Sequence, residues 1–152
     1  MPSFRTSRIV AHPAKAMFDL VADVEAYPNF LPLCRALTVR ERSILPDGRT
    51  LFVADMEVGY KAIRERFTSR VTCDSEKLEI LVEYIDGPFR HLENRWHFIE
   101  RGERSCKVEF DISYEFKNRA LALLVGGMFE TAFRKFAEAF ENRADLVYGR
   151  AG

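Results

Sequence analysis

The sequence is poor in cysteine and carries no excess of either charge. Its three cysteines, Cys34, Cys73 and Cys106, form no Cys-x-x-Cys motif and leave one over in any disulfide scheme, so we expect reduced thiols in a cytosolic protein. Lysine plus arginine and aspartate plus glutamate both number 23. This balance excludes attraction to nucleic acid or anionic lipid by net charge alone, so any such attraction requires a local patch.

Long hydrophobic runs and targeting signals are also missing. No stretch reaches the roughly 18 uninterrupted apolar residues that suggest a membrane span. The amino-terminal stretch lacks the apolar run of a signal peptide and the length of a transit peptide. We therefore expect a cytoplasmic protein, and peripheral contact with the inner face of the membrane stays open.

Catalytic signatures are absent as well. The sequence has no HExxH, GxSxG or GxGxxG motif and no cysteine–histidine cluster at metal-ligand spacing. His91 and His97 alternate with apolar residues and are predicted to face solvent, so Glu65 is nearly alone as an inward-facing acid or base. These observations favour a binding protein over an enzyme, with no catalytic residue, cofactor or metal expected.

The sequence does contain a succession of strand patterns that ends in one helical pattern. A first short strand is predicted over 3–11, followed by two short helices, the first of which opens at Pro13. Strands are then predicted over 36–45, 50–60, 61–73, 77–85, 89–100 and 105–116, with a turn at Pro46-Asp47-Gly48. Apolar residues recur at three- and four-residue steps from Asn118 to Tyr148, which predicts one long helix.

This order predicts a single α+β domain over residues 1–152. An antiparallel sheet of about six to seven strands with one apolar face needs a cover on that face, and the carboxy-terminal helix is the only large element available. A curved sheet wrapped round one helix, with two short helices after the first strand, is the helix-grip or START-like fold. Because one helix cannot fill the concavity of a long curved sheet, we expect an internal cavity.

The face of the sheet that is predicted to point inward is almost wholly apolar. Most such positions in proteins belong to ordinary core, so the cavity hypothesis depends on the architecture and not on any single side chain. The residues that we expect to line the cavity are Phe30, Leu31, Met56, Phe67, Ser69, Asn94, Trp96, Phe110, Tyr114, Met128, Phe129 and Phe133.

Glu65, Ser69 and Asn94 are polar residues on this apolar face. A buried polar group without a hydrogen-bond partner costs about 1–3 kcal/mol. One interpretation is that the three bond to one another or lie at a bulge. The other is that they face a ligand, in which case Ser69 and Asn94 would offer it hydrogen bonds.

The segment YPNFLPL, residues 27–33, is too apolar for an ordinary loop, and its two prolines exclude a long helix or a central strand. Residues 120–129, ALALLVGGMF, are also uncharged and contain a helix-weakening pair, Gly126-Gly127. The two segments either simply pack on each other or form one rim of the cavity. In the second case a gate that contacts the bilayer would be formed by Tyr27, Pro28, Phe30, Leu31 and Pro32.

Arg64, Arg66 and Arg70 are predicted to form a basic ladder on the outer face of one strand. Pairing with Glu79 and Glu83 on the neighbouring strand would neutralise this ladder. The alternative is contact with an anionic partner, such as lipid headgroups or nucleic acid phosphates.

Three stretches carry a resemblance to a known family. They are FDLVADVEAYPNFLPLC (18–34), RFTSRV (66–71) and GPFRHLENRWHF (87–98), followed by the phenylalanine-rich helix. With them the chain resembles the coenzyme Q-binding START-domain family over nearly its whole length. Bacterial members of that family are also described as ribosome-association toxins, and it belongs to the polyketide cyclase/dehydrase and lipid-transport superfamily. The resemblance implies a ubiquinone-binding protein that supports respiration, with Ser69 and Asn94 as candidates to bond a quinone carbonyl. With no transit sequence in the chain, we expect the bacterial form and not the mitochondrial one.

Three functions are therefore expected as alternatives. The first is non-catalytic binding of ubiquinone or a related isoprenoid lipid in the cavity, as a chaperone or carrier for respiratory electron transport, with transient membrane contact. The second is binding to the large ribosomal subunit, which would block subunit association through the arginine ladder. The third is a polyketide cyclase or aromatase-like enzyme. Ubiquinone would be a ligand and not a cofactor, and no DNA partner is expected.

Overall fold

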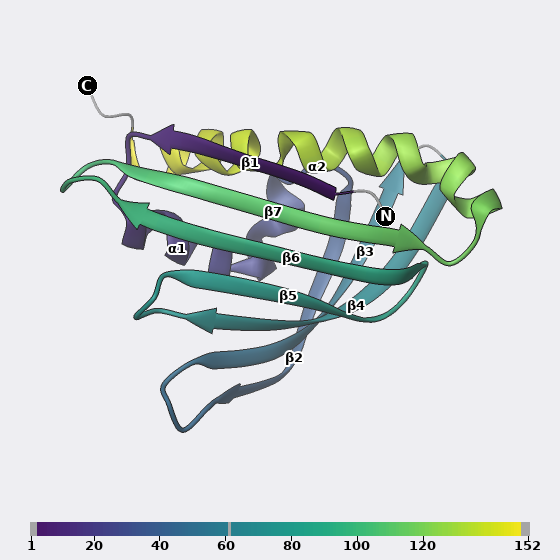
Figure 1. Ribbon diagram of the computed structural model, residues 1–152, viewed down its shortest axis with the longest axis horizontal. Helices are drawn as coiled ribbons and strands as arrows, with labels where there is room; N and C mark the ends of the chain where they lie inside the picture. Colours follow the sequence, from purple (N-terminus) through teal and green to yellow (C-terminus); the bar gives the residue numbers. More distant parts are fainter. Residues whose placement is uncertain (1–2, 61, 150–152) are drawn as a thin grey trace.

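Seven strands form one antiparallel sheet in the computed structural model, which describes residues 3–60 and 62–149. The strand order is β1-β7-β6-β5-β4-β3-β2 (Figure 1). The elements are β1 (Ser3–Val10), α1 (Ala14–Ala22), the 3-10 helix η1 (Val24–Asn29), β2 (Cys34–Ile44), β3 (Thr50–Tyr60), β4 (Ile63–Asp74), β5 (Glu79–Asp86), β6 (Phe89–Glu100), β7 (Cys106–Phe116) and α2 (Arg119–Tyr148). The predicted α+β helix-grip fold is confirmed.

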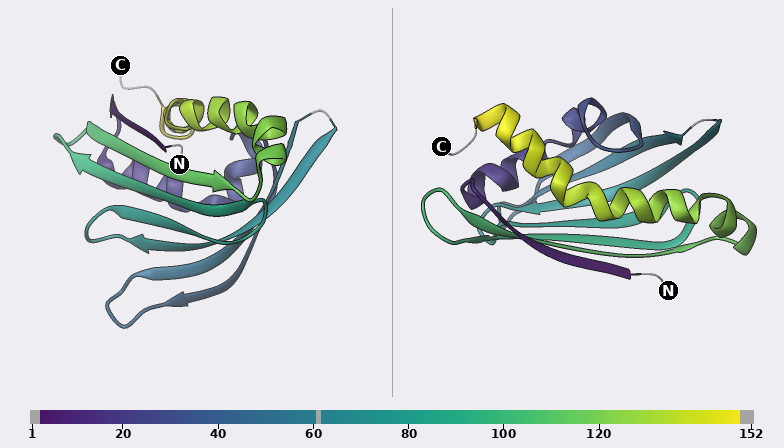
Figure 2. Two further views of the ribbon diagram at one scale, coloured as in Figure 1. Left: turned by 45° about the vertical axis from the view of Figure 1, so that its right-hand side comes forward. Right: turned by 90° about the horizontal axis from the view of Figure 1, so that it is seen from above.

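The two short helices α1 and η1 lie between β1 and β2, which are the two edge strands of the sheet. After β1, these two short helices carry the chain to β2 at the opposite edge of the sheet. The strands from β2 to β7 then pair in sequence order, and β7 returns to pair with β1. The sheet curves along this path and α2 lies across its inner side, as the views in Figure 2 show.

Gly48 and Gly87 occupy positions with a positive φ, which glycine adopts without strain. Gly48 has a φ of 91° in the β2–β3 turn, and this turn forms at the predicted Pro46-Asp47-Gly48. Gly87 has a φ of 143° between β5 and β6, and a Cβ there would lie 2.6 Å from Cβ of Phe67. Glycine at 87 therefore lets the β5–β6 turn approach Phe67 closely.

The period-two alternation decides which side chains face α2. Buried and half-buried residues alternate strictly along β7. On β4, Ser69 lies opposite Ala54 and Glu65 lies opposite Val58, and directly opposed residues of antiparallel strands share a face. Because Ala54 and Val58 are buried, the predicted inward orientation of Ser69 and Glu65 is confirmed.

The two ends of α2 are held differently. At its beginning, the Asn118 side chain accepts a hydrogen bond of 2.8 Å from a backbone N–H of the first turn. Near its end, Nε2 of His12 lies 2.7 Å from Oδ1 of Asp145, and the Tyr148 hydroxyl donates to the carbonyl oxygen of Ala16 at 3.1 Å. The last turns of α2 are thus tied through side chains to α1 and to the segment before it.

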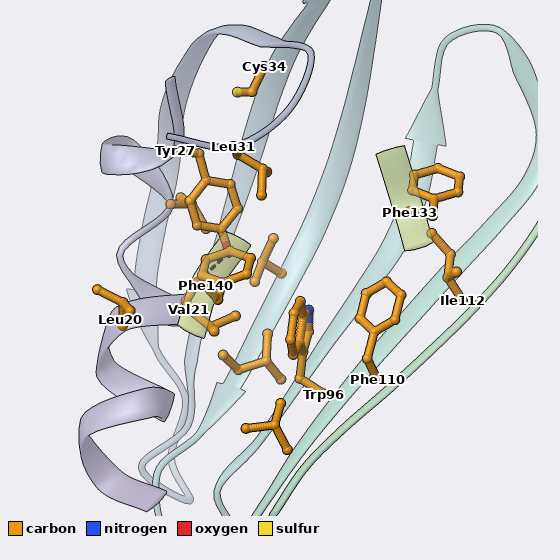
Figure 3. Close-up of a cluster of buried hydrophobic side chains, with 14 of the residues drawn as sticks. Leu20, Val21, Tyr27, Leu31, Cys34, Trp96, Phe110, Ile112, Phe133 and Phe140 are labelled. Carbon is orange, nitrogen blue, oxygen red and sulfur yellow. Dashed lines mark hydrogen bonds between the residues drawn. The ribbon is translucent and has the colours of Figure 1, made fainter. Parts of the chain in front are cut away.

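Aromatic rings join α2 to the sheet. The Trp96 ring is 4.7 Å from that of Phe110 and 5.2 Å from that of Phe140, measured between centroids (Figure 3). Further along, the rings of Tyr114 and Phe133 are 5.1 Å apart. Edge-to-face pairs of this kind each contribute about 0.5–1.5 kcal/mol beyond the burial of their area. Much of the phenylalanine-rich composition is therefore used in this layer.

Candidate functional site

An apolar cavity lies between the inner face of the sheet and α2, and the η1 region closes it on a third side. Its volume is about 90 Å³. It is lined by Val24, Tyr27, Leu31, Pro32 and Leu33 from η1 and the turn after it, by Leu37, Ala54, Met56, Val58, Phe67, Ser69, Val71, Ile80, Val82, Leu92, Asn94, Trp96 and Ile112 from the sheet, and by Phe129, Ala132, Phe133, Phe136 and Phe140 from α2. None of these described lining residues is charged.

Most of the residues predicted to line the cavity do so. They are Leu31, Met56, Phe67, Ser69, Asn94, Trp96, Phe129 and Phe133. The strand residues reach the cavity because they share the inner face of the sheet, and Phe129 and Phe133 reach it because they are four positions apart on one side of α2. Contact of any of these residues with a ligand stays a prediction.

Four predicted lining residues lie outside the cavity wall. Phe110 is fully buried behind Trp96, and Tyr114 packs against Phe133 instead of facing the space. The Phe30 ring packs on that of Phe140 at 5.2 Å and lies under the Arg143 guanidinium, also at 5.2 Å. Met128 is half-buried on a different side of α2 from Phe129. These residues support the wall and do not form it.

Several lining residues were not among those predicted. Ala132, Phe136 and Phe140 continue the apolar stripe of α2, so the three- and four-residue spacing was the signal that indicated them. Val24 and Leu33 lie in and after a 3-10 helix, where no simple periodicity points inward.

Asn94 already has two hydrogen-bond partners within the protein. Its Oδ1 accepts a 2.9 Å hydrogen bond from Nε1 of Trp96. Its Nδ2 donates a 3.0 Å hydrogen bond to the carbonyl oxygen of Asp111. Asn94 therefore holds the indole in place at the cavity wall, and the expectation that it bonds to Ser69 or Glu65 is not met by these contacts.

Ser69 is the polar residue of the wall whose side chain has no hydrogen-bond partner among the described residues. Its side chain is 4% exposed, and its Oγ has no hydrogen-bond partner among the residues that the structure describes. The residue lies next to an irregularity in the β4–β5 pairing, between Thr68 and Ser69. An orphaned buried hydroxyl costs about 1–3 kcal/mol. Ser69 is thus the side chain of the cavity best able to bond an incoming polar atom.

The segment 27–33 forms one side of the cavity, but it is not an open loop. Tyr27 and Leu31 are buried, and Pro28, Phe30 and Pro32 are half-buried. The Tyr27 hydroxyl donates to the carbonyl oxygen of Val21. Of the predicted gate residues, only the half-buried three have surface to offer a membrane, and that contact stays a prediction.

The partner of this segment on α2 differs from the one we expected. The rings of Tyr27 and Phe30 both contact Phe140, at centroid distances of 5.2 Å. Phe140 lies 11 positions beyond the end of 120–129, which corresponds to about 16 Å along the helix. The aromatic contacts of 27–33 with α2 are therefore with its carboxy-terminal half, and Phe129 is the residue of 120–129 that lines the same cavity as 27–33.

The arginine ladder on β4 is partly neutralised by neighbouring strands. Arg70 pairs with Glu83 at 3.4 Å, as the cross-strand interpretation predicted. Arg64 instead approaches Glu57 on β3, at 3.9 Å. Arg66 lies opposite the same Glu57 in the β3–β4 register. Acidic residues thus accompany the ladder along its length, which weakens its field toward an anionic partner.

Titratable chemistry at the cavity is limited to groups that burial keeps neutral. Burial raises the pKa of the Tyr27 hydroxyl well above its ordinary value. Burial also raises the pKa of Cys34, Cys73 and Cys106, which are not among the lining residues, to about 11, so all three are thiols at neutral pH. No group of three or more His, Cys, Asp or Glu among the described residues is placed to hold a metal ion. The wall can therefore offer apolar surface and a hydroxyl.

A long helix across a curved antiparallel sheet, with an uncharged cavity between them, defines a helix-grip domain of the START type. Residues 10–141 match the family described as polyketide cyclase/dehydrase and lipid transport, and the chain belongs to that family.

The similar proteins include ribosome association toxins and a coenzyme Q-binding protein. The chain is 35% identical to the ribosome association toxin RatA of Pseudomonas aeruginosa over 144 residues, which covers 94% of this chain and 95% of that protein. It is 33% identical to RatA of Escherichia coli, over 97% of this chain and 90% of the relative. It is 28% identical to the mitochondrial coenzyme Q-binding protein COQ10 homolog B of Xenopus laevis, over 97% of this chain but 59% of that protein.

Solved structures show the same architecture. An 18 kDa protein from Caulobacter crescentus is 30% identical with a TM-score of 0.78, and the match covers 98% of this chain and 99% of that one. An aromatase/cyclase from Streptomyces has a TM-score of 0.77 at 17% identity, over 99% of each chain. The second likeness concerns the fold alone. None of the described helices is long and apolar enough to cross a membrane.

Proposed function

We propose that the protein binds an isoprenoid lipid of the ubiquinone type in its apolar cavity, without catalysis, as a carrier or chaperone for respiration. The observation that carries this proposal is the composition of the wall, which is uncharged and holds one buried hydroxyl, that of Ser69, without a partner among the described residues. Apolar pockets with a few placed polar groups are typical of sites for such ligands. The relative from Xenopus laevis that is named as coenzyme Q-binding gives further support.

Ser69 is the residue we assign to the ligand's polar head. A quinone carbonyl is a hydrogen-bond acceptor, and a serine hydroxyl can donate one hydrogen bond. Asn94 is assigned a structural role, because its hydrogen bonds already go to Trp96 and to the backbone at Asp111. The head group would thus lie between β4 and α2.

The energetics of the tail suit a carrier. Moving apolar carbon out of water gains about 0.8 kcal/mol per CH₂, or roughly 3–4 kcal/mol for the five carbons of an isoprene unit. A tail that comes from a bilayer exchanges one apolar medium for another, so the net change is small. Loading and release can then be decided by small terms, such as one hydrogen bond to the head.

The cavity has to widen to take such a ligand. Sites for small molecules typically span about 300–1,000 Å³, whereas the volume here is about 90 Å³. The end of α2 is tied through His12 and Asp145, so we assign the widening to a displacement of the earlier part of the helix, which carries Phe129 and Phe133. A long tail would follow the space that this movement opens.

The test is mass spectrometry of lipid that co-purifies with the protein from a ubiquinone-producing cell. The matched variant is Ala132→Leu, which fills the cavity from α2, and its control is Ala139→Leu, which adds the same carbons at a half-buried position outside the wall. We expect ubiquinone with the wild type and Ala139→Leu, and at least about tenfold less with Ala132→Leu. The proposal fails if no isoprenoid lipid is recovered, or if Ala132→Leu carries as much as the wild type.

Ribosome binding is a second candidate, favoured by the likeness to RatA proteins over almost the whole chain. In this alternative the chain would bind the large ribosomal subunit and block subunit association. The pairing of Arg64 and Arg70 with glutamates makes the ladder a weaker anion site than its sequence suggests. A cyclase or aromatase activity is the third alternative, and the uncharged wall argues for binding over acid–base chemistry.

A further inference from the structure

We propose that the amino-terminal end of α2 is a docking surface for an anionic lipid bilayer. Ala120, Leu123, Leu124 and Gly127 are all exposed. Their spacing, i, i+3, i+4 and i+7, places them on one side of the helix, and this is the spacing with which a helix normally faces a core. We call these four residues the 120–127 stripe. It faces solvent, with Leu123 81% and Leu124 67% exposed.

The stripe is separate from the face of α2 that builds the core. Val125 and Phe129 are buried from the same turns and point toward the sheet. The first turns of α2 also project beyond the end of the sheet, as the right-hand view of Figure 2 shows. Apolar surface at this end of α2 is therefore presented outward on a protruding part of the molecule.

The charges around the stripe are positive and favour an anionic partner. Lys117 and Arg119 are exposed at the start of α2, and the sequence has no acidic residue from 117 to 129. The amino-terminal end of a helix carries a partial positive charge, so cations there are unfavourable within the protein itself. Anionic headgroups would stabilise both the two cations and the helix end, while the leucines enter the apolar boundary of the bilayer.

A second copy of the chain fits this surface less well. A two-fold contact with the two helices parallel would bring Lys117 and Arg119 close to the same residues of the other copy, and like charges repel. The course of α2 also favours a bilayer as the partner. The helix passes from the stripe straight into the cavity wall at Phe129, so docking would put that wall next to the membrane.

Vesicle flotation tests the surface without any ligand of the cavity, so its failure is distinct from a failure of lipid binding. The vesicles contain phosphatidylcholine alone or with about 30 mol% phosphatidylglycerol. The variant Leu123→Ser/Leu124→Ser is compared with Ile44→Ser/Leu146→Ser, which removes side chains that are 77% and 76% exposed elsewhere. Thermal unfolding of each variant confirms that it is folded.

We expect the wild type and Ile44→Ser/Leu146→Ser to float with the anionic vesicles, and Leu123→Ser/Leu124→Ser to bind about tenfold more weakly. The proposal is overturned if the leucine variant floats like the wild type. It is also overturned if the wild type ignores anionic vesicles, or if it sediments as a dimer that only the leucine variant dissociates.

A charge-reversal pair tests the electrostatic half of the surface. Lys117→Glu/Arg119→Glu should lose binding to the anionic vesicles by about tenfold, whereas Arg101→Glu/Arg104→Glu, which reverses two exposed charges in the β6–β7 turn, should not. Equal loss in both pairs would show that net charge, and not this surface, drives the binding, and would overturn the assignment.

Discussion

Trp96 donates a hydrogen bond of 2.9 Å from its indole Nε1 to Oδ1 of Asn94 at the wall of the cavity. Asn94 passes this restraint to β7 by donating to the carbonyl oxygen of Asp111. Of the lining residues, Ser69 is the one whose buried side-chain oxygen has no partner in the described part of the chain. Asn94 and Ser69 therefore have different roles: Asn94 is structural, and Ser69 is available to a ligand.

Replacing Ser69 by alanine should move stability and affinity in opposite directions. The variant loses an unpaired buried hydroxyl, so its free energy of unfolding should rise by about 1 kcal/mol in the absence of ligand. Its affinity for a short-tailed ubiquinone analogue should fall about two- to tenfold, the value of one hydrogen bond. Urea unfolding and ligand titration measure the two quantities. Ser113→Ala, on the outer face near His91, is the control and should leave affinity unchanged.

Replacing Asn94 by alanine should destabilise the fold. Truncation leaves the indole N–H of Trp96 and the carbonyl of Asp111 without their partner, so the free energy of unfolding should fall by about 2–4 kcal/mol. Urea unfolding gives this value, and the near-ultraviolet circular dichroism of the single tryptophan reports on its loss of orientation. A change below about 0.5 kcal/mol with an unaltered spectrum would remove the structural role of Asn94.

The glycine pair in α2 should limit stability and permit movement. A Cβ at Gly126 would meet Phe116 at 3.8 Å, and one at Gly127 would meet nothing within 4 Å, so alanine fits at both positions. Each replacement should raise the free energy of unfolding by about 1 kcal/mol. If α2 bends here during loading, Gly126→Ala/Gly127→Ala should also slow ligand uptake in stopped-flow measurements. Asn142→Ala, later on the same helix, should not slow it, and unchanged uptake in the glycine variant would place the bend elsewhere.

The ribosome alternative makes a prediction about the ladder on β4. If Arg64, Arg66 and Arg70 carry contact with the large subunit, reversing all three to glutamate should abolish co-sedimentation with ribosomes. The control reverses Arg5, Arg90 and Arg95, which are exposed on β1 and β6. Retained co-sedimentation of the ladder variant, or equal loss in the control, would exclude this ladder as the contact.

The strands could be predicted because their signals are local. Alternation along β7 and the turn chemistry at Gly48 depend on neighbouring residues only, and both are confirmed. The cavity wall was partly predictable for the same reason, since parity alone places Ser69 on the inner face.

What the sequence could not supply depends on long-range packing. Trp96 and Phe110 have the same parity, but only the position of Phe140 on α2 decides that Trp96 faces the cavity while Phe110 lies behind it. The contact between residues 27–33 and Phe140 joins positions more than 100 residues apart, and no periodicity encodes it. The partners of Asn94 were likewise hidden, because one of them is a backbone carbonyl on another strand.

The most direct measurement of the central claim is a titration of Trp96 emission with a short-tailed ubiquinone analogue. Trp96 is the only tryptophan of the chain and lies in the cavity wall, so the emission of the protein reports on a residue of that wall. The account predicts saturable quenching together with a raised melting temperature, and loss of both in Ala132→Leu. Saturating analogue that leaves emission and melting temperature unchanged in the wild type would contradict it.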